Sequence, residues 1–236
     1  VTGCGGGGGS DGTSSAAEKT QGIYGGIAST GESLATFVLS DGRFWILYQG
    51  NGSQRGFVYG NGTENGTAFT AISAADFHFE PAAITPSALT ATVQTKSSLA
   101  GTLRFNGQDA TFNVLYNEPP LVSNIGGTYQ IVISALTDGV ETFTLVGNLT
   151  VSSSGAISGM TAEGCTVSGS AKPRGDINVH SLSLTLTGTL CPVNVSLDGI
   201  AYFEELNVPT SSTRQMTGFS TSAASDIGFL VSALAF

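Results

Sequence analysis

The side chains best suited to acid/base or metal chemistry in this sequence are Asp76, His78 and Glu80. They lie two residues apart, so on a β-strand all three would point to the same face. Such a trio could bind a metal ion or form an acid/base pair. We favour the alternative, in which Phe77 and Phe79 fill a core on the opposite face while the three polar side chains face water.

Other candidates for catalysis are few. The chain has two histidines, and no serine outside the glycine-rich N-terminal run lies in a Gly-x-Ser-x-Gly pattern. Glu204 and Glu205 could supply paired carboxylates, but adjacent strand residues face opposite ways, and we expect them to cap a strand end. His180 shares a face with Leu182 and Leu184, which favours a hydrogen-bonded, partly buried side chain over a ligand. We therefore expect a protein that is not an enzyme, with no catalytic residue, metal site or cofactor.

The first ten residues have a different character, because a short run of small residues ends at Cys4 and five glycines follow. Glycine loses the most backbone entropy on ordering and buries no side chain, so this run predicts a flexible tether. Val1-Thr2-Gly3-Cys4 resembles the lipobox of bacterial lipoproteins, which are cut before the cysteine and acylated on its thiol. The resemblance implies lipidation of Cys4 and, because Gly5 rather than Asp follows, an outer-membrane location. A free or disulfide-bonded cysteine in a disordered N-terminus is the alternative.

The chain has three cysteines. If Cys4 is acylated, Cys165 and Cys191 remain as a pair in an oxidising compartment. A disulfide between them would close a loop of about 26 residues and stabilise the fold by roughly 3 kcal/mol. Two buried free thiols are the alternative. A zinc site has less support, because neither cysteine lies in a Cys-x-x-Cys motif.

Charge restricts the partners. The formal net charge is −9, and there are only 8 Lys and Arg residues. Binding to nucleic acid needs clustered cationic side chains, so we expect no nucleic-acid partner. The acidic balance also disfavours adsorption to anionic lipid. Membrane association is therefore expected through the acyl chains on Cys4.

The spacing of turns indicates an all-β protein. Turn residues recur every eight to twelve positions between short runs of Val, Ile, Leu, Phe and Thr. Asp41-Gly42 and Asn106-Gly107 predict tight hairpin turns, and separate strands are expected at 67–73 and 76–80. On the strand at 43–49, large side chains alternate on both faces, which indicates a central strand.

The chain divides near its middle. Pro119-Pro120 interrupts the strand pattern, because proline cannot donate to a β-ladder. Gly127-Thr128-Tyr129 then repeats Gly22-Ile23-Tyr24 about 105 residues later. We therefore expect four segments: a lipobox and tether at 1–20, a first β domain at 21–118, a linker at 119–126, and a second β domain at 127–236 that contains the disulfide. About eight antiparallel strands per half fit a lipocalin-like meander, either a β-barrel or a β-sandwich.

The whole arrangement resembles proteobacterial surface lipoproteins with a Gly-rich tether and two small β-barrel-like units. The motifs that carry the resemblance are Asp41-Gly42-Arg43-Phe44-Trp45, Cys165 with Gly169, and Cys191-Pro192. Members of this group mostly have no assigned activity, so the resemblance implies location and fold more than function.

Taken together, these features predict a lipid-anchored outer-membrane lipoprotein, periplasmic or surface-exposed, that is a non-enzymatic binding or accessory subunit for another envelope or surface protein. The candidate anchors for that partner are Trp45, Tyr48, Phe57 and Tyr59, although we expect core packing for most of them. One alternative is a carrier of a small apolar ligand inside a β-barrel. A hydrolase that uses His78 ranks last.

Overall fold

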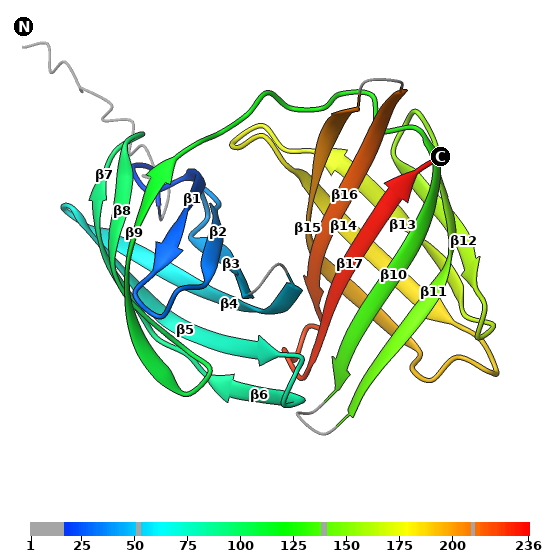
Figure 1. Ribbon diagram of the computed structural model, residues 1–236, viewed down its shortest axis with the longest axis horizontal. Helices are drawn as coiled ribbons and strands as arrows, with labels where there is room; N and C mark the ends of the chain where they lie inside the picture. The colour runs from blue at the N-terminus through cyan, green and yellow to red at the C-terminus, as the bar shows by residue number, and fades with distance from the viewer. Residues whose placement is uncertain (1–16, 51–52, 138–140, 209–210) are drawn as a thin grey trace, which may run out of the picture.

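The computed structural model describes residues 17–50, 53–137, 141–208 and 211–236, and it contains two antiparallel β-barrels that stand side by side (Figure 1). The strands of barrel 1 are β1 (Gly22–Ala28), β2 (Ser33–Val38), β3 (Arg43–Gly50), β4 (Ser53–Asn65), β5 (Ala68–His78), β6 (Ala83–Pro86), β7 (Leu89–Gln94), β8 (Ser98–Phe105) and β9 (Gln108–Tyr116). The strands of barrel 2 are β10 (Gly127–Thr137), β11 (Glu141–Val151), β12 (Ala156–Thr161), β13 (Thr166–Pro173), β14 (His180–Thr187), β15 (Val195–Val208), β16 (Ser211–Thr221) and β17 (Ile227–Ala235). Cys4 and most of the expected tether lie outside the described residues.

Each barrel is a closed meander of eight antiparallel strands. In barrel 1, β9 pairs with β1 and β4 pairs with β5, while the short β6 is an additional strand beside the end of β5. In barrel 2, β17 pairs with β10 and completes the ring. The expected all-β fold with two meander units is therefore confirmed, and both units are closed barrels rather than sandwiches. No helical segment in the described part of the chain has the length and apolarity needed to cross a membrane.

Two local expectations were wrong. Residues 76–78 do not begin a separate strand, because β5 continues through this alanine-rich region while β4 pairs with it along its length. Structure also begins before residue 21. Residues 17–20 form a turn on barrel 1, where the backbone amides of Lys19 and Thr20 donate to Glu64 Oε1 at 2.7 and 2.8 Å.

The Gly-x-Tyr motifs occupy equivalent positions in the two barrels. Tyr24 is buried at the start of β1, and its hydroxyl donates to the carbonyl of Thr20 at 2.8 Å. Tyr129 is buried at the start of β10, and its hydroxyl donates to the carbonyl of Ile125 at 2.8 Å. Each tyrosine therefore ties the chain four residues upstream to the first strand of its barrel.

Side chains pack the interior of both barrels. Barrel 1 is filled by a cluster that includes Phe44, Phe69 and Leu103. Barrel 2 is filled by a cluster that includes Phe229 and the predicted disulfide between Cys165 and Cys191, which is confirmed with an S–S distance of 2.10 Å.

A third apolar cluster joins the barrels. It combines residues from the outer face of barrel 1 with residues from the facing strands of barrel 2. Phe57 stacks on Phe77 at 4.8 Å between ring centroids, and Phe219 of barrel 2 packs against Phe57 at 5.8 Å and against Phe37 at 5.7 Å. Burial of so many aromatic rings favours one rigid body over two barrels on a hinge.

Candidate functional site: the groove between the barrels

The structure places Asp76 and His78 inside barrel 1 and leaves Glu80 exposed beyond β5. The expectation that all three face water was wrong, because Phe77 points outward into the apolar contact with barrel 2 and its neighbours must then point inward. Asp76 accepts hydrogen bonds from the Tyr48 hydroxyl at 2.6 Å and from the Asn106 backbone amide at 2.7 Å. Burial raises the pKa of the Asp76 carboxyl, although these hydrogen bonds act in the opposite direction. No cluster of three metal-ligating side chains occurs among the described residues.

His180 is buried inside barrel 2, where its ring meets Phe203 edge-on at 5.0 Å. Neither ring nitrogen has a hydrogen-bond partner among the described protein atoms, so the expectation of a hydrogen-bonded histidine was wrong. Burial lowers the pKa of His180, which favours its neutral form.

The candidate aromatic anchors are mostly core residues, as expected. Trp45, Tyr48 and Phe57 are buried and Tyr59 is half-buried. They therefore stabilise barrel 1 and its contact with barrel 2, and they offer little surface to a partner.

Two hollows lie at the junction of the barrels. One, of about 370 Å³, is lined by β1, β2 and β3 of barrel 1 and by β15 and β16 of barrel 2. The other, of about 430 Å³, lies between the linker segment 119–124 and β15. The two hollows share Pro119, Tyr202 and Glu204, so they are adjacent, and we call them together the inter-barrel groove.

The inter-barrel groove has aromatic, amide and carboxylate side chains. Phe37 packs against Tyr202 at 5.9 Å, while Gln49 and Gln215 contribute amide groups. Tyr202 donates a hydrogen bond to Glu204 Oε1 at 3.3 Å. Burial and the nearby Glu204 carboxylate raise the pKa of Tyr202 to about 12, so the phenol remains protonated and can donate. Glu204 lies within the long strand β15 and lines the groove, which corrects the expectation that it caps a strand end.

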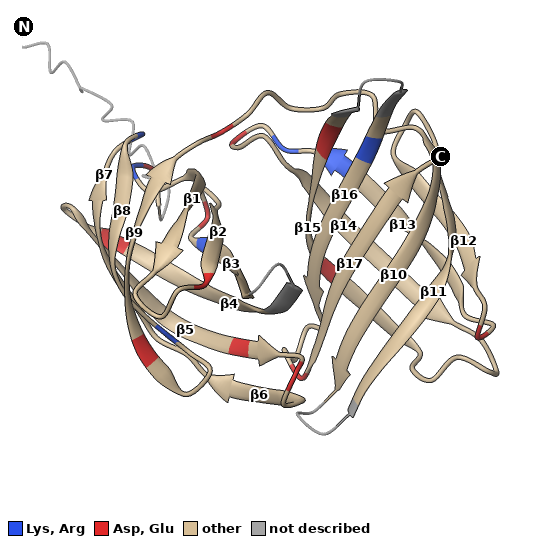
Figure 2. Ribbon diagram, viewed as in Figure 1, with Lys and Arg blue, Asp and Glu red and all other residues tan. Residues whose placement is uncertain are grey.

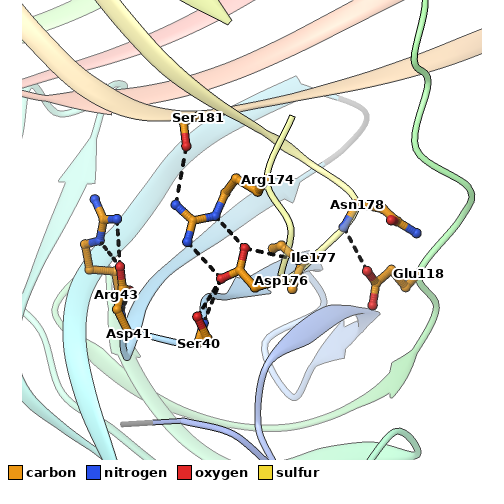
Figure 3. A network of polar contacts seen from close by, with 9 residues as sticks. All are labelled: Ser40, Asp41, Arg43, Glu118, Arg174, Asp176, Ile177, Asn178 and Ser181. Atoms are coloured by element: carbon orange, nitrogen blue, oxygen red, sulfur yellow. Dashed lines mark hydrogen bonds and ion pairs between the residues drawn. The ribbon is translucent and has the colours of Figure 1, made fainter. Parts of the chain in front are cut away.

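A polar clamp beside the groove fixes the two barrels relative to one another (Figure 3). Asp176 lies between β13 and β14 of barrel 2, and its Oδ2 accepts from the backbone amide of Ser40 at 3.0 Å and from the Ser40 hydroxyl at 2.8 Å. Ser40 lies between β2 and β3 of barrel 1. Arg174 binds the same carboxylate with two nitrogens, at 2.7 and 2.8 Å, and also donates to the Ser181 hydroxyl. This bidentate geometry is the strongest arrangement of an arginine and a carboxylate.

The electrostatics of the clamp favour an ionised carboxylate. Burial alone would raise the pKa of Asp176, but hydrogen bonds from Arg174 and Ser40 hold it well below its usual range. The side chains of Arg174 and Asp176 are only 16% and 15% exposed, so water screens the pair weakly.

The linker supplies a second polar contact between the barrels. Glu118 follows β9 and accepts from the Asn178 backbone amide at 2.8 Å (Figure 3), while Asn178 Nδ2 donates to the carbonyl of Pro119 at 2.8 Å. Glu118 also accepts from the Tyr116 hydroxyl at 2.6 Å. The linker therefore contacts both barrels and forms a fixed wall of the groove.

Charged residues are sparse on the side of barrel 2 formed by β10, β11, β12 and β17 (Figure 2). Four aliphatic side chains are exposed there on neighbouring strands: Val132, Val146, Met160 and Leu234, at 42%, 40%, 62% and 47%. Exposed apolar patches of this kind are typical of contact surfaces.

Sequence reasoning missed the groove and the clamp, because Ser40 and Asp176 are 136 residues apart in the chain. The sequence of β3 did contain a sign of this contact. Apolar side chains occupy both faces of that strand, which indicates that the outer face of barrel 1 is also buried. Comparisons with protein-family models, curated proteins and solved structures gave no match to this chain.

Proposed function

We propose that this protein is a lipid-anchored lipoprotein of the bacterial outer membrane and a non-enzymatic binding or accessory subunit for another envelope or surface protein. The anchor would be the acylated Cys4, and the support for it is the resemblance of Val1-Thr2-Gly3-Cys4 to a lipobox. The two-barrel body would present the inter-barrel groove to the partner.

The observation that carries the binding role is the groove itself. Binding sites concentrate in concave surfaces between domains, and they combine apolar area with a few fixed polar groups. Here the partly exposed Pro119, Pro120 and Leu121 supply apolar area, Glu204 a carboxylate and Gln49 an amide. The clamp and the apolar contact hold these groups in place before a partner arrives, which lowers the entropic cost of binding. An extended segment of the partner could occupy both adjacent hollows of the groove.

The alternative expectation, a carrier for an apolar ligand inside a barrel, has less support. Both barrel interiors are packed with buried side chains, including Phe69 in barrel 1 and Phe229 in barrel 2. A ligand would have to displace these side chains and would lose their packing energy.

Photo-crosslinking in intact cells tests the binding role. A photoreactive amino acid at Gln49 or Thr217, both in the groove, should capture one stoichiometric envelope protein. The same probe at exposed Thr92 of β7, on the side of barrel 1 away from barrel 2, should not capture it. Glu204→Lys should abolish capture, whereas Glu163→Lys, an equal charge change at an exposed turn of barrel 2, should not. Capture from Thr92 alone, or capture that Glu204→Lys leaves unchanged, would contradict the proposal.

Mass spectrometry of the protein purified from its native membrane tests the anchor. The N-terminal peptide should carry a diacylglycerol thioether on Cys4. An unmodified thiol at that position would overturn the outer-membrane assignment while leaving the groove experiment intact.

A further inference from the structure

A separate cavity opens at one end of barrel 1, away from the inter-barrel groove. It has a volume of about 240 Å³ and lies between two hairpin turns, the β1–β2 turn with Thr30 and Glu32 and the β8–β9 turn with Asn106. Phe105, Gln108 and Ala110 complete its lining. The β8–β9 turn is tight, as predicted from the sequence, because Asn106 and Gly107 both adopt positive φ angles of 51° and 69°.

Glu32 gives this cavity an unsatisfied acceptor. Its Oε2 atom is shielded from solvent and has no hydrogen-bond partner among the described protein atoms. A buried carboxylate oxygen without a donor is costly, so native proteins nearly always provide one. None of the six residues that line the cavity is cationic, so no lysine or arginine of the lining balances the charge of the Glu32 carboxylate.

The wall behind the cavity is fixed and partly aromatic. The Phe105 ring lines the cavity and packs on Tyr48 at 4.8 Å. Tyr48 and the Asn106 amide are both held by the buried Asp76 carboxylate. The ring and the turn that face the cavity therefore have defined positions before any ligand binds.

We propose that this cavity binds a single cationic group, an ammonium or a guanidinium. The group would pair with Glu32, contact the ring of Phe105 through a cation–π interaction, and donate further hydrogen bonds to the oxygens of Thr30 and Gln108. The cavity is smaller than the lower end of the range for drug-sized ligands, about 300 Å³, which fits one charged group and its stem. That group could belong to a free amine or to a Lys or Arg side chain of a peptide. The inference does not depend on the groove.

Chemical-shift titration of the full chain tests the proposal and separates the two sources. n-Butylammonium chloride represents the free amine, and the capped peptides acetyl-Gly-Lys-Gly-amide and acetyl-Gly-Arg-Gly-amide represent the side chains. We expect saturable shifts of the amides of Thr30, Asn106 and Gln108 with at least one of these probes. The neutral n-butanol, at equal concentration, should cause none.

Two variants test the role of charge and of the cavity. Glu32→Gln should weaken binding at least tenfold, whereas Glu163→Gln, which removes the same charge from a distant exposed turn, should leave it unchanged. Gln108→Trp, at an exposed edge of the cavity, should block access while the amide spectrum elsewhere stays the same.

Binding by butylammonium alone would identify a small amine as the ligand, and binding by the peptides would identify a side chain. Absence of saturable shifts with all three probes would overturn the proposal, as would equal shifts with butanol. Unchanged affinity in Glu32→Gln would also overturn it.

Discussion

Asp176→Asn should uncouple the two barrels more than any other single charge change near the groove. The Asp176 carboxylate accepts five hydrogen bonds, two from Ser40, two from Arg174 and one from the amide of Ile177. Breaking a buried ion pair by removing one partner costs about 3–5 kcal/mol. Because both side chains retain some exposure, 16% and 15%, we expect the lower end, about 3 kcal/mol.

Urea-induced unfolding at pH 7 measures this loss. Trp45 is the only tryptophan and is buried in the contact between the barrels, so its fluorescence reports on that contact. Far-ultraviolet circular dichroism reports on the strands. In the unsubstituted protein the two signals should change together, and in Asp176→Asn the fluorescence change should come at lower urea concentration.

Acid should remove the same stabilisation in the unsubstituted protein. The pKa of Asp176 is lower in the folded state than its usual value of 3.8, so folding favours the ionised form. This stabilisation is fully present above about pH 4 and declines as the pH falls through the range below it, by at most about 1.4 kcal/mol per pH unit. Asp176→Asn should lack this component of the pH dependence.

Asp109→Asn is the matched control. Asp109 also binds an arginine through two oxygens, but that pair is 51% and 56% exposed, and pairs of this kind contribute little. If Asp176→Asn destabilised the protein no more than Asp109→Asn, the clamp would not hold the barrels together.

Three further predictions concern stability, measured by urea unfolding. The double variant Cys165→Ser/Cys191→Ser should lose about 3 kcal/mol, because the bridge closes a 26-residue separation in barrel 2. Gly228→Ala should destabilise the contact between the barrels by about 1–3 kcal/mol, because its Cβ would overlap the ring of Phe77. Tyr48→Phe should cost about 1–3 kcal/mol, since it removes a donor from the buried Asp76 carboxylate.

Each of these has its own control. Addition of a reductant should lower the stability of the unsubstituted protein but not that of the double cysteine variant. Gly175→Ala should be close to neutral, because a Cβ there meets no neighbouring atom within 4 Å. Tyr116→Phe removes a hydroxyl from a more exposed tyrosine and should cost less than Tyr48→Phe. An equal loss of stability in Gly228→Ala and Gly175→Ala would contradict the first argument. An equal loss in Tyr48→Phe and Tyr116→Phe would contradict the second.

The elements of each barrel could be predicted from the sequence because they depend on local chemistry. Positive-φ turns such as Asn106-Gly107 and the alternation of apolar and polar residues are visible within a few positions. The Gly-x-Tyr motif identified the start of each barrel for a similar reason, since Tyr24 and Tyr129 bond to the chain only four residues away.

The burial of Asp76 and His78 could not be predicted in the same way. Strand alternation says which residues share a face, but not which face is inside when both are covered. Phe77 faces barrel 2, and a sequence offers no direct sign that a second domain will cover an outer wall. The clamp could not be predicted from the sequence for the same reason, because Ser40 and Asp176 come together only when both barrels have formed.

The aromatic contact between the barrels also determines what happens when the chain is divided at the linker. The first barrel alone would expose to solvent the apolar face that carries Phe37, Phe57 and Phe77. Such a face favours pairing with another copy, so a truncated chain should self-associate where the full chain does not expose this surface.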